Sequence, residues 1–385
     1  MTNVLLIHNT PTPYRTELFN RLSTLMRERN MHFHVIFQGT TTKRRSYWEN
    51  AVEGSDFSYQ FSKSMSIGGY LHKFRIPLNP IWEFGRNAPS IIVATGFNLH
   101  TIFAFLYARI TNIPLMIWTG EREIKGVGKS LRILVRKWLL RSTRHLFTYG
   151  TATEDFYSRN FDFPVEKMTT LLNVIPVRHE IDILTKIESK KRKLEKEILR
   201  LILVGDLKRS KGIYYIPDIL TELVSLLPQH EIELIIIGGG PEEETLRNSL
   251  NLYQEKQERV VIHFLGKIHN RQVLHEIAGS HFLLFPTLGE PWGHVITEAF
   301  SVGTPVVTSR SAGAVPDMLK EEENGFVVDF DDPNQIAKTI RATISDVYVY
   351  EEMCNLAKQS YQDIFSSLDN AGAMVDVITK ELQDT

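Results

Sequence analysis

The sequence predicts an α/β protein built from two doubly wound domains. Short runs rich in Val, Ile and Leu, bounded by turn residues, alternate with helical stretches along the whole chain. Runs this continuously apolar suit parallel strands that helices cover on both faces. At 385 residues the chain is too long for one ordinary domain, and the charged tract 186–198 is too polar to form core. We therefore predict two domains with a linker in that tract.

Six apolar runs lie in each half of the chain, with room for a helix between most neighbours. The strands expected in the first half are NVLLIHN (3–9), HFHVIFQ (32–38), IIVATG (91–96), LMIWTG (115–120), HLFTYG (145–150) and MTTLLNV (168–174). Those expected in the second half are LRLILVG (199–205), ELIIIGG (233–239), VVIHFLG (260–266), HFLLFPT (281–287), PVVTS (305–309) and GFVVDF (325–330).

Helical stretches follow the last expected strand, around 333–345, 347–363 and 370–383. The expected domains are therefore 1–185 and 186–365. The remaining segment, 366–385, is expected to be a helix that packs back toward the N-terminal domain.

Composition narrows the class of protein. The net charge is −1, and a single cysteine, Cys354, excludes an internal disulfide, so a reducing cytosol is the expected location. The most apolar stretch, 101–118, contains Arg109 and Pro114, which argues against a bilayer span. Charge is unevenly divided, because residues 1–180 carry 23 Lys and Arg against 13 Asp and Glu. The first half is therefore expected to face an anionic partner, either lipid headgroups or an acidic acceptor.

The segment GEPWGHVITEA (289–299) contains the residues that most directly indicate a function. Glu290 lies in a loop before a predicted helix, and Glu298 lies about one turn into it. The helix start between them, at Gly293, His294 and Val295, offers free backbone N–H groups and a dipole that suit a phosphate. Two carboxylates for hydroxyl groups beside a phosphate site indicate a sugar nucleotide.

Five segments in order make the second half resemble the retaining GT-B glycosyltransferases of family GT4. They are ILVGDLKRSKG (202–212), ELIIIGGGPEEETLR (233–247), VIHFLGKI (261–268), FLLFPTLGEPWGHVITEAFSVGTPVV (282–307) and NGFVVD (324–329). The resemblance implies two Rossmann-like domains that face each other across an interdomain cleft. In the first half, the resemblance lies in the alternation of expected strands and helices more than in particular sequence motifs.

The resemblance also implies roles for donor-binding residues. Lys211 would contact the diphosphate, Glu290 the hydroxyls of the transferred sugar, and Glu298 the ribose hydroxyls, with Lys211 and Glu290 as the catalytic residues. Asp206 stands where relatives often have an arginine, so Arg209 or Lys208 would supply the second positive charge. The remaining donor contacts are expected from the helix start at Gly293, His294 and Val295 and from the backbone of Leu265, Gly266 and Lys267.

In the first half, the loop after the first expected strand leads into a helix with Thr12 as N-cap. The resemblance places Thr12 and Arg15 near the donor phosphates and the acceptor, although a surface arginine fits the sequence as well. Where many relatives carry a histidine after the strand 115–120, this chain has Glu121, which would bind acceptor or sugar hydroxyls. Asn173 matches a frequent asparagine near the hinge.

Two other features are interpreted as ordinary structure or left with two interpretations. DFDD (329–332) is interpreted as a solvated turn, so neither a metal site nor a cofactor is expected, and no nucleic acid partner is indicated. The basic amphipathic stretch 128–144 fits an ordinary surface helix and a helix on an anionic membrane equally well, with the basic first half favouring the membrane.

The resulting hypothesis is a cytoplasmic, metal-independent, retaining hexosyltransferase, peripheral on the inner face of the membrane. It would move a sugar from a UDP- or GDP-sugar to a hydroxyl of a glycan or lipid-linked acceptor in bacterial surface polysaccharide or glycoconjugate synthesis. The alternatives are a catalytically silent GT-B subunit that binds a nucleotide sugar and a GT-B sugar-nucleotide epimerase.

Overall fold

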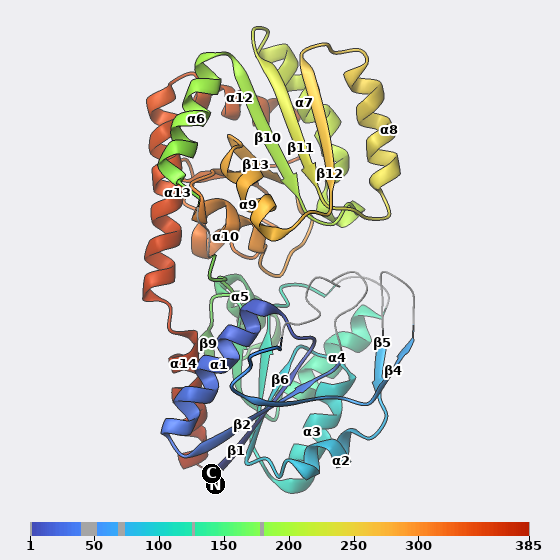
Figure 1. Ribbon diagram of the computed structural model, residues 1–385. Helices are drawn as coiled ribbons and strands as arrows, with labels where there is room; N and C mark the ends of the chain where they lie inside the picture. Colours follow the sequence, from blue (N-terminus) through green and yellow to red (C-terminus); the bar gives the residue numbers. More distant parts are fainter. Residues whose placement is uncertain (1, 40–51, 68–73, 125–127, 178–180, 385) are drawn as a thin grey trace. The chain divides into compact units, whose positions relative to one another are not determined.

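The computed structural model describes residues 2–39, 52–67, 74–124, 128–177 and 181–384 (Figure 1). They form two compact α/β units: unit 1 comprises Met1–Asn173 with Asp369–Thr385, and unit 2 comprises Val174–Leu368. The chain thus changes unit at 173/174 and again at 368/369, in place of the predicted boundaries after 185 and 365.

Unit 1 contains a seven-stranded parallel sheet in the order β3-β2-β1-β6-β7-β8-β9, with a separate hairpin β4-β5. The winding reverses between β1 and β6. The strands are β1 Thr2–His8, β2 Met31–Phe37, β3 Ser58–Phe61, β4 Ser64–Ile67, β5 Phe74–Pro77, β6 Ile91–Thr95, β7 Leu115–Thr119, β8 Thr143–Thr148 and β9 Met168–Thr170. The α-helices are α1 Pro13–Glu28, α2 Pro80–Arg86, α3 Leu99–Thr111, α4 Lys129–Leu140, α5 Thr151–Phe161 and α14 Asn370–Gln383.

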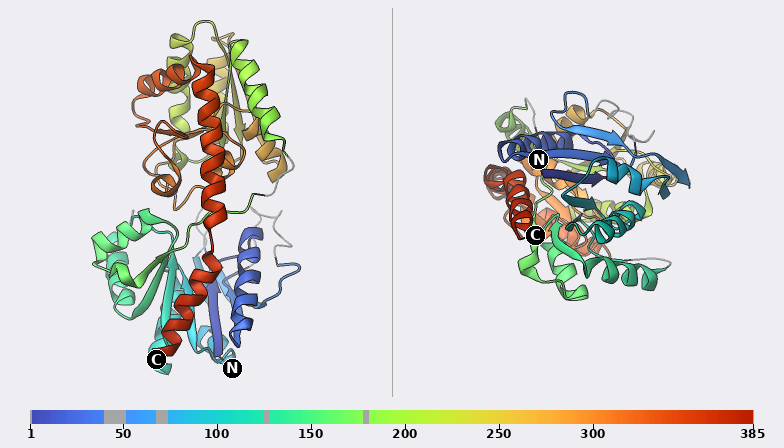
Figure 2. Two further views of the ribbon diagram at one scale, coloured as in Figure 1. Left: turned by 90° about the vertical axis from the view of Figure 1, so that its left-hand side faces the viewer. Right: turned by 90° about the horizontal axis from the view of Figure 1, so that it is seen from below.

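Both faces of this sheet are covered. Successive residues of β1 point to opposite faces, so Val4 and Leu6 join one buried cluster and Leu5 and Ile7 join the other. The first cluster includes residues of α1 and α14, and Figures 1 and 2 show these two helices side by side. The C-terminal helix therefore completes the core of unit 1.

Unit 2 contains a six-stranded parallel sheet in the order β12-β11-β10-β13-β14-β15, and its winding reverses between β10 and β13. The strands are β10 Ile198–Val204, β11 Glu231–Ile237, β12 Val260–Gly266, β13 Phe282–Phe285, β14 Val306–Thr308 and β15 Gly325–Val327. The α-helices are α6 Ile183–Glu195, α7 Ile216–Leu226, α8 Glu243–Gln254, α9 Asn270–Ala278, α10 His294–Ser301, α11 Val315–Met318, α12 Pro333–Ile344 and α13 Val347–Ser367.

The predicted linker 186–198 is wrong, because most of it belongs to helix α6. Its charged residues surround a buried stripe of Ile187, Lys190 and Leu194. The Lys190 ammonium donates a hydrogen bond of 2.8 Å to the carbonyl oxygen of Gly303, which satisfies the buried charge in part. Spacing of three and four residues between buried positions, rather than overall polarity, was the informative signal.

All twelve predicted strands are present, whereas β3, β4 and β5 were missed. Those three are only four residues long, and β3 is half exposed at the edge of its sheet. Short edge strands lack the apolar run that marks a central strand. Within the described ranges, every helix is too short or too polar to cross a bilayer.

Candidate functional site

The candidate site lies at the carboxyl edge of the unit 2 sheet, where the winding reverses. In open α/β sheets this position leaves a crevice between loops that diverge to opposite faces. β10 and β13 are neighbours there, so the loops that follow them lie together (Figure 1). The Leu288 N–H donates to the Ser210 carbonyl oxygen at 3.0 Å, which fastens one loop to the other.

This arrangement brings together the two residues predicted to be catalytic. The Lys211 ammonium, from the loop after β10, donates a hydrogen bond to Oε2 of Glu290, from the loop after β13. Their side chains retain 16% and 27% exposure, so the pair is sheltered but still open to a ligand. The ammonium also lies 5.2 Å from the centre of the Phe285 ring, a cation–π contact.

A third loop, after β14, holds the backbone of Glu290. The Glu290 N–H donates to the Ser311 carbonyl oxygen, and the Gly313 N–H donates back to the Glu290 carbonyl oxygen, both at 3.0 Å. Next to them, the Ala314 N–H donates to the Trp292 carbonyl oxygen at 2.9 Å. These bonds fix the direction of the Glu290 side chain. The sequence analysis missed this loop, although its place after the strand next to β13 was the available signal.

Helix α10 begins at His294, four positions after Glu290. Gly293 is its N-cap with φ of 103°, and His294 and Val295 form the first turn as predicted. Glu298 follows one turn later and is partly buried. Burial raises the pKa of Glu298 to about 7, and no side chain or N–H in the described part of the chain donates to its carboxylate. A ligand that donates hydrogen bonds would therefore favour the charged form of this group.

The other predicted donor residues also lie in unit 2, on the turn after β10 and at the end of β12. Arg209 is exposed on the turn that contains Lys211. Lys208 lies 3.9 Å from the carboxylate of Asp206, so part of its charge is balanced. Leu265 and Gly266 are the last residues of β12, and Lys267 follows them. The Gly266 carbonyl oxygen accepts a hydrogen bond of 2.8 Å from the Gly238 N–H.

The predicted residues of unit 1 have different surroundings. Thr12 is the N-cap of α1 as expected, and it is buried. Arg15 is 4% exposed, so it is not a surface arginine. Its guanidinium donates to Oδ1 of Asn173 at 2.5 Å and stacks 4.2 Å from the Trp118 ring centre. A cation in the first turn of α1 is thus accommodated by an amide oxygen and aromatic rings.

Glu121 is paired with Arg136 inside unit 1, a contact that the sequence analysis did not predict. The Arg136 guanidinium donates to both carboxylate oxygens at 2.6 Å, and the Tyr157 hydroxyl donates to Oε2 at 2.8 Å. Such a bidentate pair fixes both side chains. It also raises the pKa of Arg136, against the effect of its burial.

The pKa of Glu298 predicts a pH-dependent stability. Because its folded pKa of about 7 lies above the ordinary value of 4.5, folding favours the neutral acid. The contribution of the neutral Glu298 acid to stability is complete below pH 4.5 and is lost as the pH rises through 7. We expect Glu298→Gln to be more stable than the wild type above pH 7 by about 3 kcal/mol, because each pKa unit corresponds to about 1.4 kcal/mol. Thermal unfolding of both proteins from pH 5 to pH 9 measures this, and a constant difference across the range would contradict it.

Gly212 provides a second prediction, because it makes the loop junction possible. Its φ is 64°, and a Cβ there would lie 1.9 Å from the Pro286 carbonyl oxygen. Gly266 has the same φ with nothing within 4 Å, so it is a matched control for strain alone. We expect Gly266→Ala to cost about 1 kcal/mol and Gly212→Ala to cost at least twice as much, measured by urea unfolding. Equal losses would show that the close approach is relieved by a local shift.

Comparison with known proteins relates the second half of the chain to a described family. Residues 185–363 match the family described as glycosyl transferases group 1. The chain is 30% identical over 166 residues to an uncharacterized glycosyltransferase of Methanocaldococcus jannaschii, covering 43% of this chain and 41% of that protein. It is 27% identical over 182 residues to the capsular polysaccharide biosynthesis glycosyltransferase CapM of Staphylococcus aureus, covering 47% and 46%. These matches span less than half the length of either relative.

A solved structure supports the fold over the whole length. The Anabaena protein HepE, crystallised in complex with UDP, aligns with a TM-score of 0.70 and 17% identity over 100% of both chains. The two parallel sheets, each with a reversal of winding, agree with that likeness. Residues 185–363 are therefore similar to the glycosyl transferases group 1 family, and the whole chain has the GT-B fold.

Proposed function

We propose that the protein is a retaining glycosyltransferase that moves a hexose from a nucleotide-diphosphate sugar to an acceptor hydroxyl. The observation that carries the proposal is the pairing of Lys211 with Glu290 beside the start of α10, with Glu298 one turn further on. Each of these groups matches a separate part of the donor: diphosphate, sugar and ribose.

The chemistry follows from what each group does to charge. When the bond between sugar and diphosphate breaks, negative charge develops on the leaving phosphate. The Lys211 ammonium and the N-terminus of α10 stabilise that charge, and they do so most strongly in the transition state. The acceptor attacks from the face that the phosphate leaves, and a phosphate oxygen takes its proton. Arg209 adds a further positive charge at the rim.

Glu290 and Glu298 select the donor. In the proposed complex Glu290 accepts hydrogen bonds from sugar hydroxyls and releases Lys211 to the diphosphate. Glu298 accepts from the ribose hydroxyls, while the backbone of Leu265, Gly266 and Lys267 contacts the base. UDP is the favoured nucleotide because HepE was crystallised with it.

The acceptor side is proposed to be a glycan or lipid-linked molecule of surface polysaccharide synthesis. The name of CapM, a capsular polysaccharide enzyme, supports this class. Helix α4 exposes Leu131, Leu134 and Trp138 at 65%, 63% and 39%, between basic residues. This face suits the surface of an anionic membrane on the cytoplasmic side, to which the basic first half adds attraction.

The test is a screen of UDP-, GDP- and ADP-sugars by thermal shift with EDTA present, followed by an assay of nucleotide release. We expect one donor class to stabilise the protein and to be turned over slowly, since a ligand at 100 times its Kd adds about 2.7 kcal/mol. Binding without release, even with acceptors, would favour a silent subunit. Conversion of the donor to an epimer with its nucleotide intact would favour the epimerase.

A further inference from the structure

Unit 1 contains a cavity of about 740 Å³ at its own reversal of winding. Asn9 and Thr10, which follow β1, form part of its lining, and Phe97 and Asn98, which follow β6, form another part. The cavity thus occupies the position in unit 1 that the Lys211 loop occupies in unit 2. None of its described lining residues was assigned above to the donor.

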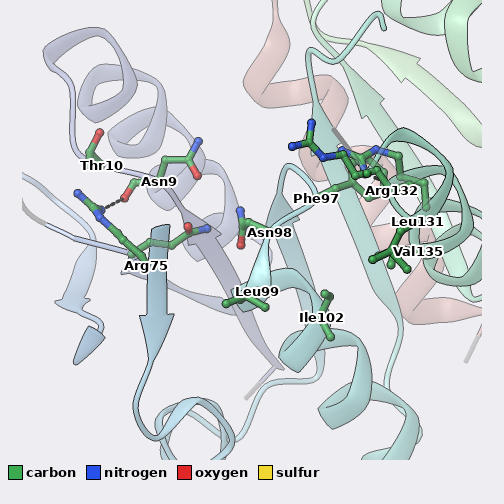
Figure 3. Close-up of a pocket in the computed structure, with 13 residues that line it drawn as sticks. Asn9, Thr10, Arg75, Phe97, Asn98, Leu99, Ile102, Leu131, Arg132 and Val135 are labelled. Atoms are coloured by element: carbon green, nitrogen blue, oxygen red, sulfur yellow. Dashed lines mark hydrogen bonds between the residues drawn. The ribbon is translucent and has the colours of Figure 1, made fainter. Parts of the chain in front are cut away.

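Among the described residues of the lining, the charged side chains are all basic. They are Arg75, Arg132 and Arg136. The carboxylate of Glu121, which is not among the described lining residues, balances the charge of Arg136. Figure 3 shows Arg75 beside Asn9 on one wall and Arg132 on the opposite wall. The Arg75 Nη1 donates to the Asn9 carbonyl oxygen at 3.3 Å, which holds the guanidinium at the cavity.

The charge of Arg75 also acts on His100 in unit 1. Burial and, to a smaller extent, the charge of Arg75 together lower the pKa of His100 to about 4. Burial also lowers the pKa of Arg75 itself. An anion in the cavity would oppose both effects, because it would stabilise the charge on Arg75.

Gln38 gives an independent indication of a ligand. It lines the cavity at 5% exposure, and its side-chain nitrogen has no hydrogen-bond acceptor among the described residues. Its backbone is satisfied, since the N–H donates to His8 at 2.8 Å and the carbonyl oxygen accepts from Ser64 at 3.1 Å. A buried amide donor left unmatched costs free energy unless a bound group accepts from it.

The rest of the lining is apolar. Leu99, Ile102, Leu131 and Val135 come from α3 and α4, and Figure 3 shows Leu99 and Ile102 between the two arginine walls. Leu131 is also part of the exposed face of α4 described above. The cavity therefore combines donors for an anion with a surface for hydrocarbon that continues to the outside of the unit.

We propose that this cavity binds the phosphate of the acceptor, with Arg75 and Arg132 on the phosphate oxygens, Gln38 donating a further hydrogen bond, and the apolar wall against attached hydrocarbon. Arginine is suited to this role because its planar fork matches phosphate oxygens. The identification of the bound molecule as the acceptor rests on the proposed transfer reaction. A phosphorylated sugar and a prenyl diphosphate-linked sugar share this chemistry, and the test separates them.

The experiment measures binding of three probes to the full chain by calorimetry: inorganic pyrophosphate, farnesyl diphosphate and farnesol. We expect farnesyl diphosphate to bind, and Arg75→Gln and Arg132→Gln each to weaken its binding by about 10-fold or more, the usual value of a charge-assisted hydrogen bond. Arg132 is exposed, so its replacement is compatible with folding. Arg109→Gln, exposed on α3, is the control and should leave binding unchanged.

A further variant, Gln38→Met, keeps the shape and removes the amide, and we expect it to weaken binding by about 5-fold or more. Tight binding of pyrophosphate alone would identify a free phosphorylated acceptor, whereas a need for the prenyl chain would identify a lipid-linked one. Equal binding of farnesol and farnesyl diphosphate, or equal binding to wild type and both arginine variants, would overturn the proposal. UDP binding, measured on the same samples, tests the donor site separately and should be unaffected by these variants.

Discussion

Lys211→Met is expected to reduce turnover of the nucleotide sugar by about 100- to 1,000-fold, the range found when one preorganised donor to a developing oxyanion is removed. The ammonium is held by Glu290 in a sheltered position, so its charge acts on the leaving phosphate with little screening by water. Binding of the donor should weaken much less than turnover, because the stabilised charge develops in the transition state.

Single-turnover release of the nucleotide diphosphate, compared with the Kd of UDP, measures the two effects separately. Lys338→Met is a suitable control, since Lys338 is exposed on α12 and far along the chain from the site. It should match the wild type in both measurements. If Lys211→Met retained more than a tenth of the wild-type rate, the leaving-group role of Lys211 would have to be abandoned.

The second large effect is a division of labour between the two glutamates. Glu290→Gln should lower turnover by about 100-fold while the Kd of UDP stays nearly constant, because UDP lacks the sugar that Glu290 is proposed to contact. Glu298→Gln should instead weaken UDP by about 10-fold or more, the value of hydrogen bonds from the ribose to a charged acceptor.

The Glu298 effect has a distinctive pH dependence. The pKa of Glu298 is raised to about 7 by burial, so ribose binding to its carboxylate should release a proton below pH 7. Calorimetry with a UDP-sugar in buffers of different ionisation enthalpy detects that proton, since both phosphates of the donor are esterified and do not titrate there. Wild type and Glu298→Gln should differ at pH 6 and agree in proton release at pH 9. Reversal of the two glutamates in these assays would refute the assigned roles.

The central strands and the Glu290–Glu298 segment were predictable because their signals are local. A buried parallel strand is apolar along its whole length, and a proline, a glycine and an apolar helical repeat mark the start of α10. The family resemblance implied that Lys211 and Glu290 serve one donor site, whereas their direct contact was not predicted. In the structure it follows from the neighbouring positions of β10 and β13, which no short stretch of sequence specifies.

The internal partners of charged residues were not predictable from the sequence. Arg15 and Glu121, which the sequence analysis associated with ligands, have the partners Asn173 and Arg136 inside unit 1. Each partner lies at least 15 positions away along the chain. Helix α6 was taken for a linker because its charge was obvious, while the surface that covers Ile187 and Leu194 comes from distant parts of unit 2.

The sequence by itself determined the two α/β units, their central strands and the residue types at the proposed donor site, because hydrophobic period, helix signals and motif spacing act over a few residues. Tertiary structure alone decided which charges are internal and which face a ligand, since that depends on what distant chain segments bring alongside. The same reason explains the cavity of unit 1: Gln38, Arg75 and Arg132 form no motif, and only the order of the strands gathers them around one space.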